Sequence, residues 1–243
     1  MSTSKTADIV FCIDASTSMK PCFSMLQKSI GSMMAGLTGG QSTWDVRFEF
    51  IAHSASPNGV VRHMSVFNEG AIDAIYGESQ AKFFTDAMDV FARRLAAIEM
   101  VGDEAPLIAL DTALDLPWRD PAKCHRVVIL LTDEPFEDGV FVDGQRDKLP
   151  QIVKKIQDLK VLLFIVAPQS AVFDELSQVD KSEYEVLDSK NDGMQSVDFT
   201  KLLAAIGKSV SVSNLQETKP PVVERGLFGQ ASWGGASEPM YGA

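Results

Sequence analysis

The most apolar stretch of this sequence ends abruptly at a carboxylate. Residues 126–133 read Arg-Val-Val-Ile-Leu-Leu-Thr-Asp, and a shorter apolar run over residues 7–13 likewise stops at Asp14. Uninterrupted apolar runs of this length are typical of strands that are buried on both faces, as in parallel sheets covered by helices on each side. The two runs therefore favour a fold in which strands alternate with helices.

Helical and strand patterns do alternate along the rest of the chain. Apolar residues at spacings of three and four predict helices, and short runs of β-branched and aromatic residues predict strands. Further strands are expected at residues 44–53, 60–67, 160–167 and 184–187, and helices at residues 23–37, 79–100, 106–116, 147–159, 173–179 and 197–212. The first two of these strands, joined by a turn at residues 54–59, are expected to form an antiparallel hairpin. The predicted fold class is α/β, a three-layer α/β/α sandwich with a mostly parallel, doubly wound sheet and one antiparallel edge hairpin strand.

The length of the chain, 243 residues, suits one domain with an extension rather than two domains. We expect the domain over residues 1–212 and a flexible tail rich in Gly, Pro and Ser over residues 213–243. Two large aromatic residues of this tail, Phe228 and Trp233, are candidate anchors for a partner.

Charge and composition exclude several classes of protein. The formal net charge of −11 repels phosphates and anionic lipid surfaces, so we expect no binding to nucleic acid or membranes. No apolar run approaches the roughly 18 residues of a membrane helix, and the first residues lack the apolar segment of a signal peptide. The three cysteines, at positions 12, 22 and 124, form no CxxC pair, which is typical of reduced thiols. We therefore expect a cytoplasmic protein.

Oxygen-bearing side chains gather where the predicted strands end. Asp14, Ser16 and Ser18 follow the first strand, Asp133 ends the most apolar strand, and residues 102–104 form a Gly-Asp-Glu turn before a helix. Ligand sites of open α/β sheets lie beyond the carboxyl ends of the strands. Hard oxygen donors from separate loops are what Mg²⁺ or Mn²⁺ requires, since such an ion takes about six oxygen ligands. Helix capping is the alternative role for any one of these loops.

The pattern Asp14-Ala-Ser16-Thr-Ser18 after a buried strand resembles the metal-ion-dependent adhesion site of von Willebrand factor A domains. The strand end at Asp133 resembles the second aspartate motif of that family, and the resemblance covers about residues 7–212. It implies a protein–protein interaction module that binds one divalent cation, Mg²⁺ or else Mn²⁺ or Ca²⁺. A protein partner would then present an Asp or Glu carboxylate to the metal.

The second loop resembles one branch of that family, in which a glutamate faces the metal. In that branch the loop is followed by a helix and then by a Leu-x-Trp pattern, which here is residues 116–118. When this sequence is aligned with the pattern of that branch at Trp118, Glu104 takes the position of the metal-facing glutamate. This chain departs from the pattern at Thr17, where the family usually has glycine, and at Asp103, where this branch has proline. Asp103 and Glu104 both remain candidates for the second loop, and we favour Glu104.

The leading hypothesis is therefore a cytoplasmic, non-enzymatic adaptor with a metal site formed by Asp14, Ser16, Ser18, Glu104 and Asp133. One alternative is a metal-independent scaffold that binds through its aromatic tail. Another is a phosphatase-like hydrolase with Asp14 as the nucleophile. Such enzymes usually place a second aspartate two residues further on, where this sequence has Ser16. Nucleotide-binding GxGxxG and GxxxxGK[ST] loops are absent from the sequence.

Overall fold

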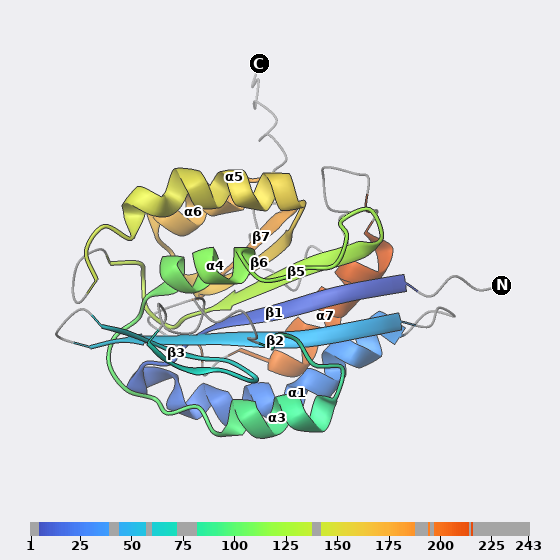
Figure 1. Ribbon diagram of the computed structural model, residues 1–243, viewed down its shortest axis with the longest axis horizontal. Helices are drawn as coiled ribbons and strands as arrows, with labels where there is room; N and C mark the ends of the chain where they lie inside the picture. The colour runs from blue at the N-terminus through green and yellow to red at the C-terminus, as the bar shows by residue number, and fades with distance from the viewer. Residues whose placement is uncertain are drawn as a thin grey trace, which may run out of the picture.

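A seven-stranded sheet with helices on both faces forms the described part of the protein (Figure 1). The computed structural model describes residues 5–38, 44–56, 60–71, 82–137, 142–187, 194, 197–213 and 215. The strands are β1 (Lys5–Asp14), β2 (Trp44–Ala55), β3 (Val61–Met64), β4 (Glu69–Ala71), β5 (Cys124–Leu131), β6 (Leu162–Pro168) and β7 (Ser182–Leu187). The helices are α1 (Lys20–Thr38), α3 (Met88–Ala96), α4 (Pro106–Leu114), α5 (Leu149–Leu159), α6 (Ala171–Ser177) and α7 (Phe199–Val212), with short 3₁₀ turns at Thr17–Met19 and Arg146–Lys148.

The strands lie in the order β4-β3-β2-β1-β5-β6-β7. Neighbouring strands from β2 to β7 in this order are parallel, whereas β3 pairs antiparallel with both β2 and β4. The predicted α/β sandwich with an antiparallel hairpin at one edge is thus confirmed. Strand β4 was not predicted, because three residues are too few to show a period. The carboxyl ends of the parallel strands all lie at the left of Figure 1.

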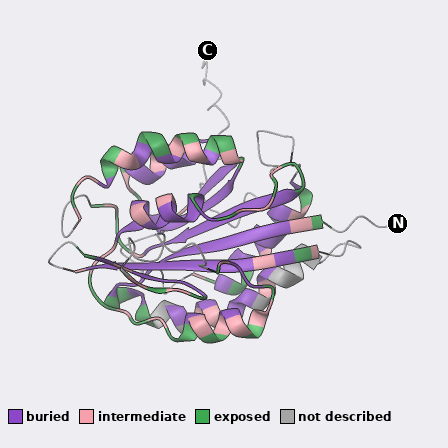
Figure 2. Cartoon of the chain, viewed as in Figure 1, coloured by how far each residue is buried: buried purple, intermediate pink, exposed green. Residues whose placement is uncertain are grey.

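Alternate residues of the central strands point into two separate cores. On β1, Ile9 and Phe11 belong to a core formed with α1, α3 and α7, whereas Val10 and Cys12 belong to a core formed with α4, α5 and α6. Figure 2 shows the strands buried along nearly their whole length between two layers of helices that are exposed on their outer sides. This two-sided burial is the reason that the strands read as continuous apolar runs.

The predicted helix at residues 79–100 is wrong over residues 82–87, while residues 79–81 lie outside the described part of the chain. Helix α3 covers only Met88–Ala96, and residues 82–87 are not helical. Thr85 instead forms a bridge with Phe48 on the edge of β2, and the backbone N–H of Phe84 donates to Glu49 Oε2 at 3.1 Å. The same carboxylate accepts hydrogen bonds from two further backbone N–H groups through Oε1. This tertiary pairing overrides the helical spacing of the apolar residues.

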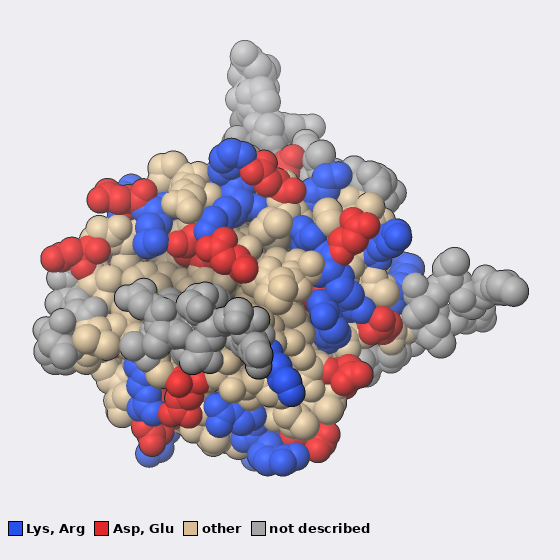
Figure 3. Space-filling view, in the orientation of Figure 1, with Lys and Arg blue, Asp and Glu red and all other residues tan. Residues whose placement is uncertain are grey.

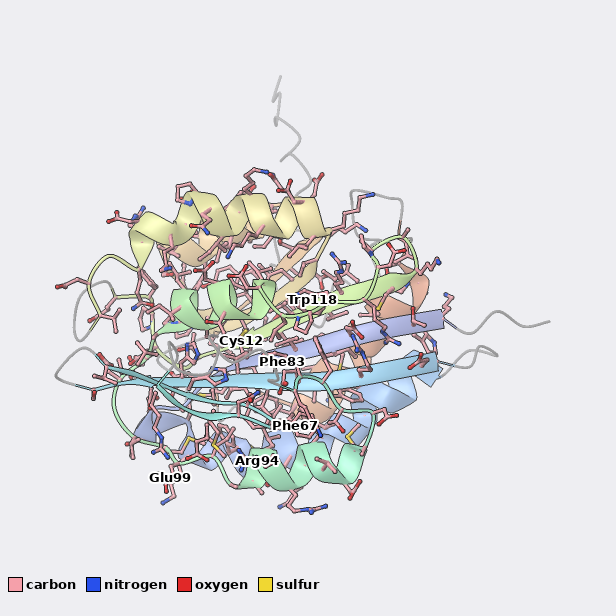
Figure 4. All side chains as sticks on the ribbon, viewed as in Figure 1. Cys12, Phe67, Phe83, Arg94, Glu99 and Trp118 are labelled. Atoms are coloured by element: carbon pink, nitrogen blue, oxygen red, sulfur yellow. The ribbon has the colours of Figure 1, made fainter. Side chains whose placement is uncertain are left out.

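A buried ion-pair network fixes the amino-terminal half of β1. Asp8 is fully buried and accepts hydrogen bonds from Arg47 Nε at 2.9 Å and Arg119 Nε at 2.7 Å. Burial alone would raise the pKa of Asp8, but the hydrogen bonds and charges of the two arginines hold this pKa below its ordinary value. Basic side chains gather over this part of β1 and β2 in Figure 3. Trp118, beside Arg119 in sequence, lies on the α4 side of the sheet and donates from Nε1 to the carbonyl of Ala113 at 3.0 Å (Figure 4).

Two further expectations concern membrane-spanning helices and the predicted tail. None of the helices among the described residues is long and apolar enough to cross a membrane. Apart from Ser213 and Leu215, the predicted tail lies outside the described residues, and so do Phe228 and Trp233. The flexible tail and its binding role therefore stay predictions.

Candidate metal centre

The first and third predicted loops leave the sheet from adjacent strands. β1 and β5 are parallel neighbours, with Ile13 opposite Leu131, so the chain after each strand emerges at the same edge. Asp14 is the last residue of β1 and is only 6% exposed. The hydroxyl of Thr132, the first residue after β5, donates a hydrogen bond to Asp14 Oδ2 at 3.0 Å. Sequence reasoning did not identify this role of Thr132, although the residue was part of the predicted strand end.

The loop after β1 is folded around the Asp14 carboxylate. The backbone N–H of Ser16 donates to Asp14 Oδ1 at 2.7 Å, and the hydroxyl oxygens of Ser16 and Ser18 lie 2.8 Å apart. A 3₁₀ turn then leads into α1, and its buried Met19 anchors the turn in the core. Thr17, where the family usually has glycine, is exposed. The hydroxyl group of Ser16 thus lies between the Asp14 carboxylate, to which it is hydrogen-bonded, and the hydroxyl group of Ser18.

Asp133 lies within hydrogen-bonding distance of the first loop. The hydroxyl of Ser18 donates to Asp133 Oδ1 at 3.0 Å, which joins the loops after β1 and β5 a second time. Burial raises the pKa of Asp133, and the hydrogen bond from Ser18 opposes that effect. The structure therefore brings together Asp14, Ser16, Ser18 and Asp133, as the positions of the strand ends predicted.

The second predicted loop is held against the end of β2. The backbone of Asp103 forms two hydrogen bonds with Ala55, of 2.8 and 3.0 Å, and the N–H of Val101 donates to the carbonyl of Ala15 at 2.9 Å. Gly102 between them has φ of +81°, and a Cβ atom there would lie 2.3 Å from the carbonyl oxygen of Ala55. Only glycine therefore allows this close approach of the loop to β2.

Glu104 lies close enough to Asp14 for their charges to interact. Burial, a hydrogen bond with the Asp103 side chain and the charge of Asp14 raise the pKa of Glu104 to about 9. A hydrogen bond between two carboxyl groups requires a proton on one of them. Asp103 and Glu104 both line the same pocket, so the geometry leaves open which of them would face an ion.

The three loops surround a pocket of about 400 Å³. Its lining includes Ser16 and Ser18, Asp103 and Glu104, and residues 134–137, which read Glu-Pro-Phe-Glu. Glu134 and Glu137 were not predicted as part of the site. Their position directly after Asp133, in the loop at the carboxyl end of β5, is the signal that could have identified them.

The electrostatics of the pocket favour a cation. Burial, followed in smaller measure by the charge of Asp133, raises the pKa of Asp14 to about 6, although three hydrogen bonds oppose the shift. No lysine or arginine of the described chain forms an ion pair with Asp14, Glu104 or Asp133. A bound cation would offset the mutual repulsion of these carboxylates.

The donor set fits a hard divalent ion only if the serine hydroxyls take part. Among the described residues, no three His, Cys, Asp or Glu side chains gather closely enough to hold a metal by themselves. Carboxylate and hydroxyl oxygens together are ligands that suit Mg²⁺, which usually also keeps several waters. His53 stands opposite Asp14 in the register of β1 and β2, and its Nε2 is hydrogen-bonded to Nδ1 of His63 on β3 at 3.0 Å.

Comparisons with known proteins agree with the fold. No protein-family model and no curated protein sequence matches this chain. A solved von Willebrand factor type A protein from Catenulispora acidiphila superposes with a TM-score of 0.55 at 11% identity, over 86% of this chain and 43% of that one. Proximal thread matrix protein 1 from the mussel byssus gives 0.54 at 14% identity, over 86% of this chain and 48% of the other. The human COPII-coat protein Sec24c gives 0.49 at 11% identity, over 86% and 32%.

At these levels of identity, the first two likenesses establish the fold alone. The chain spans less than half the length of each of the three solved structures. The fold is similar to that of the solved von Willebrand factor type A protein, and this is the fold that the resemblance of the strand-end motifs implied.

Proposed function

We propose that this von Willebrand factor A-like chain is a non-enzymatic protein-interaction module that binds one divalent cation at the ends of β1 and β5. Asp14, Ser16, Ser18 and Asp133 would hold the ion, and Glu104 would contribute from the second loop. The bound ion would supply an open coordination position for a carboxylate of a protein partner.

The observation that supports the proposal most directly is the pair of hydrogen bonds between the two loops. Thr132 donates to Asp14 and Ser18 donates to Asp133, each at 3.0 Å. These contacts hold two carboxylates and two hydroxyl groups at one edge of the sheet. A preorganised set of oxygen donors is what a metal site requires, because ordering the ligands then costs little free energy on binding.

The chain's own residues also account for the proposed lack of catalysis. Ser16 stands two residues after Asp14, where an aspartate-dependent phosphatase usually needs an acid. The side chain of Ser16 lies next to Ser18 rather than at a position free to exchange protons with a substrate. Asp14 itself is buried and accepts hydrogen bonds through both carboxylate oxygens, which makes it a poor nucleophile.

Isothermal titration calorimetry with MgCl₂ and MnCl₂ tests the metal site directly. The full chain is expected to bind one ion, and Asp14→Ala is expected to abolish binding. Asp89→Ala is the matched control, because Asp89 is an exposed carboxylate on α3 that forms an ion pair with Arg93. Equal affinity of the wild type and Asp14→Ala for both ions would refute the metal site.

Partner capture with and without EDTA tests the use of that site. Chelation and Asp14→Ala are both expected to abolish capture, and a chain that ends at Asn214 is expected to retain it. If chelation and Asp14→Ala leave capture intact while the truncation abolishes it, the tail is the binding element and the proposal fails.

A further inference from the structure

The surface on the two sides of Gly102 differs sharply in chemistry. On one side lies the pocket described above, which contains carboxylates from the second and third loops. On the other side lies a groove of about 490 Å³ that Ala55, Val60, Val101 and Gly102 help to line, and we refer to it as the apolar groove. Gly102 lines both hollows, and Asp103 of the pocket is hydrogen-bonded through its backbone to Ala55 of the apolar groove.

Two aliphatic side chains are left exposed at the apolar groove. Val60 is 48% exposed and Val101 is 45% exposed. They are two of only five large apolar side chains that are this exposed in the described part of the chain. Neighbouring exposed apolar side chains on a hollowed surface favour burial against an apolar group of a partner.

Among the described residues that line the apolar groove, Arg62 is the only charged one, and its charge is balanced by two carboxylates. Arg62 donates to Glu99 Oε2 and to Glu69 Oε1, each at 2.6 Å. Glu99 is labelled toward the left of Figure 4, at the end of the molecule where the parallel strands finish. Because two carboxylates neutralise Arg62, the groove is unsuited to an acidic group and better suited to an aliphatic one.

The pocket on the other side of Gly102 has the opposite character. Glu134 and Glu137 are both exposed on its lining, and no lysine or arginine is among its described lining residues. A lone carboxylate that approaches across this rim is repelled by like charges, whereas the attraction of a neighbouring Lys or Arg to the same rim offsets that repulsion.

We infer that the partner segment is extended and carries an acidic residue with Lys or Arg on one side and a large aliphatic residue on the other. The acidic residue would meet the metal, the basic residue would meet Glu134 and Glu137, and the aliphatic residue would enter the apolar groove beside Val60 and Val101. This inference rests on the proposed function, since it takes the central carboxylate to be the metal's ligand.

Selection from a displayed library of random peptides tests the inference on the full chain. Peptides are bound in the presence of Mg²⁺ and released with EDTA. The expected enrichment is an Asp or Glu with a basic neighbour on one side and Leu, Ile, Val or Phe on the other, in either chain direction. Enrichment of acidic peptides with random flanks would overturn the inference and leave the proposed function standing. If no peptide is enriched in a metal-dependent way, the inference and the proposed function are both overturned.

Defined peptides and matched variants then locate each contact. A seven-residue peptide with lysines before and leucines after a central aspartate is compared with peptides in which glutamine replaces lysine, serine replaces leucine or asparagine replaces aspartate. Val101→Ser is expected to lower the affinity for the leucine peptide about tenfold and to leave the affinity for the serine peptide unchanged. Glu137→Gln is expected to lower the affinity for the lysine peptide about threefold at low salt and to leave the affinity for the glutamine peptide unchanged.

The two kinds of failure have different signatures in these titrations. If the asparagine peptide binds as well as the aspartate peptide, or if EDTA has no effect, the metal-bridged carboxylate is refuted. If binding requires the aspartate and the metal but each variant lowers the affinity for all peptides equally, the flanking contacts are refuted. Thermal unfolding and metal-induced stabilisation of Val101→Ser and Glu137→Gln serve as the folding controls, and both are expected to match the wild type.

Discussion

Ser18 donates its hydroxyl hydrogen to Asp133 Oδ1 at 3.0 Å and so joins two loops that are 115 residues apart in the sequence. Ser18 follows β1, and Asp133 follows β5, which is the neighbour of β1 in the sheet. The contact depends on parallel pairing of these two central strands, because only parallel neighbours bring both carboxyl ends to one edge. The candidate metal centre is therefore a direct product of the sheet topology.

Metal binding should stabilise the fold. At a concentration of Mg²⁺ about 100 times the dissociation constant, the free energy of unfolding should rise by about 2.7 kcal/mol. Asp133→Asn should remove most of this gain, because it removes a charged ligand of the third loop. Urea denaturation with and without Mg²⁺ measures both values. Asp89→Asn, on the exposed face of α3, should retain the full gain, and an undiminished gain in Asp133→Asn would contradict the assignment of that residue.

Replacing Gly102 should damage the second loop far more than an equivalent change elsewhere. Gly102→Ala forces a methyl group to within 2.3 Å of the Ala55 carbonyl oxygen at a φ of +81°. Gly144 has a similar φ of +73° but meets only an Asp147 side-chain atom, at 3.5 Å. Gly144→Ala should therefore cost only the backbone strain, about 1 kcal/mol, and Gly102→Ala about 2 kcal/mol more.

The metal response separates local from global damage in this pair of variants. Gly102→Ala should lower the calorimetric affinity for Mg²⁺, since Glu104 lies two residues further along the displaced loop. Gly144→Ala should bind Mg²⁺ like the wild type. Equal urea midpoints for the two variants would show that the approach of Gly102 to β2 does not matter.

Glu183 should make the stability of the protein fall as pH rises. Its side chain on β7 is only 1% exposed, and neither carboxylate oxygen has a hydrogen-bond partner among the described residues. Burial and the charge of Glu185 raise the pKa of Glu183 from 4.5 to about 9. A carboxyl group with a raised pKa contributes stability that is fully present below pH 4.5 and is lost as the pH rises toward 9.

Glu183→Met removes the buried carboxylate at similar volume and should stabilise the protein by about 1–3 kcal/mol at pH 8. The gain should shrink as the pH is lowered toward 5, where the wild-type side chain is protonated. Urea denaturation at several pH values measures this slope. Glu175→Met, at an exposed position on α6, should leave the pH dependence unchanged. A wild-type stability that is flat between pH 5 and 8.5 would contradict the prediction.

The arginine network at the other end of β1 should govern stability without affecting the metal site. Arg119→Met leaves the buried Asp8 with one arginine instead of two and should destabilise the protein by about 3 kcal/mol. Asp8 lies six residues before Asp14, about 20 Å along the strand, so the affinity for Mg²⁺ should not change. Arg93→Met, which breaks an exposed pair with Asp89 on α3, should cost less than about 0.5 kcal/mol.

The sequence was sufficient to predict the sheet class and the meeting of the first and third loops. Buried parallel strands leave a one-dimensional signature of continuous apolar residues, and Asp14 and Asp133 stand where those signatures stop. Because β1 and β5 are adjacent and parallel, the loops that follow them meet at one edge of the sheet. The roles of Asp14, Ser16, Ser18, Glu104 and Asp133 as metal ligands remain predictions, which the titrations above address.

The parts that could not be predicted depend on contacts between residues distant in sequence. Residues 82–87 have the apolar spacing of a helix, yet Glu49 on β2 accepts a hydrogen bond from the N–H of Phe84, and Thr85 bridges to Phe48, so the segment is not helical. The position of Glu134 and Glu137 directly after Asp133 is a signal for the site, but that they line one pocket with the second loop depends on how the distant loops fold together. A local pattern contains no information on such partners.

The register of β1 against β5 has a consequence for how a cation would report on folding. Ile13 stands opposite Leu131, and Thr132 reaches Asp14 only from this alignment. A slip of one residue would turn Thr132 to the opposite face of the sheet and separate the donors. A folding intermediate with misaligned central strands would therefore not bind Mg²⁺. The time at which Mg²⁺ binding begins during refolding would then report when β1 and β5 reach their correct register.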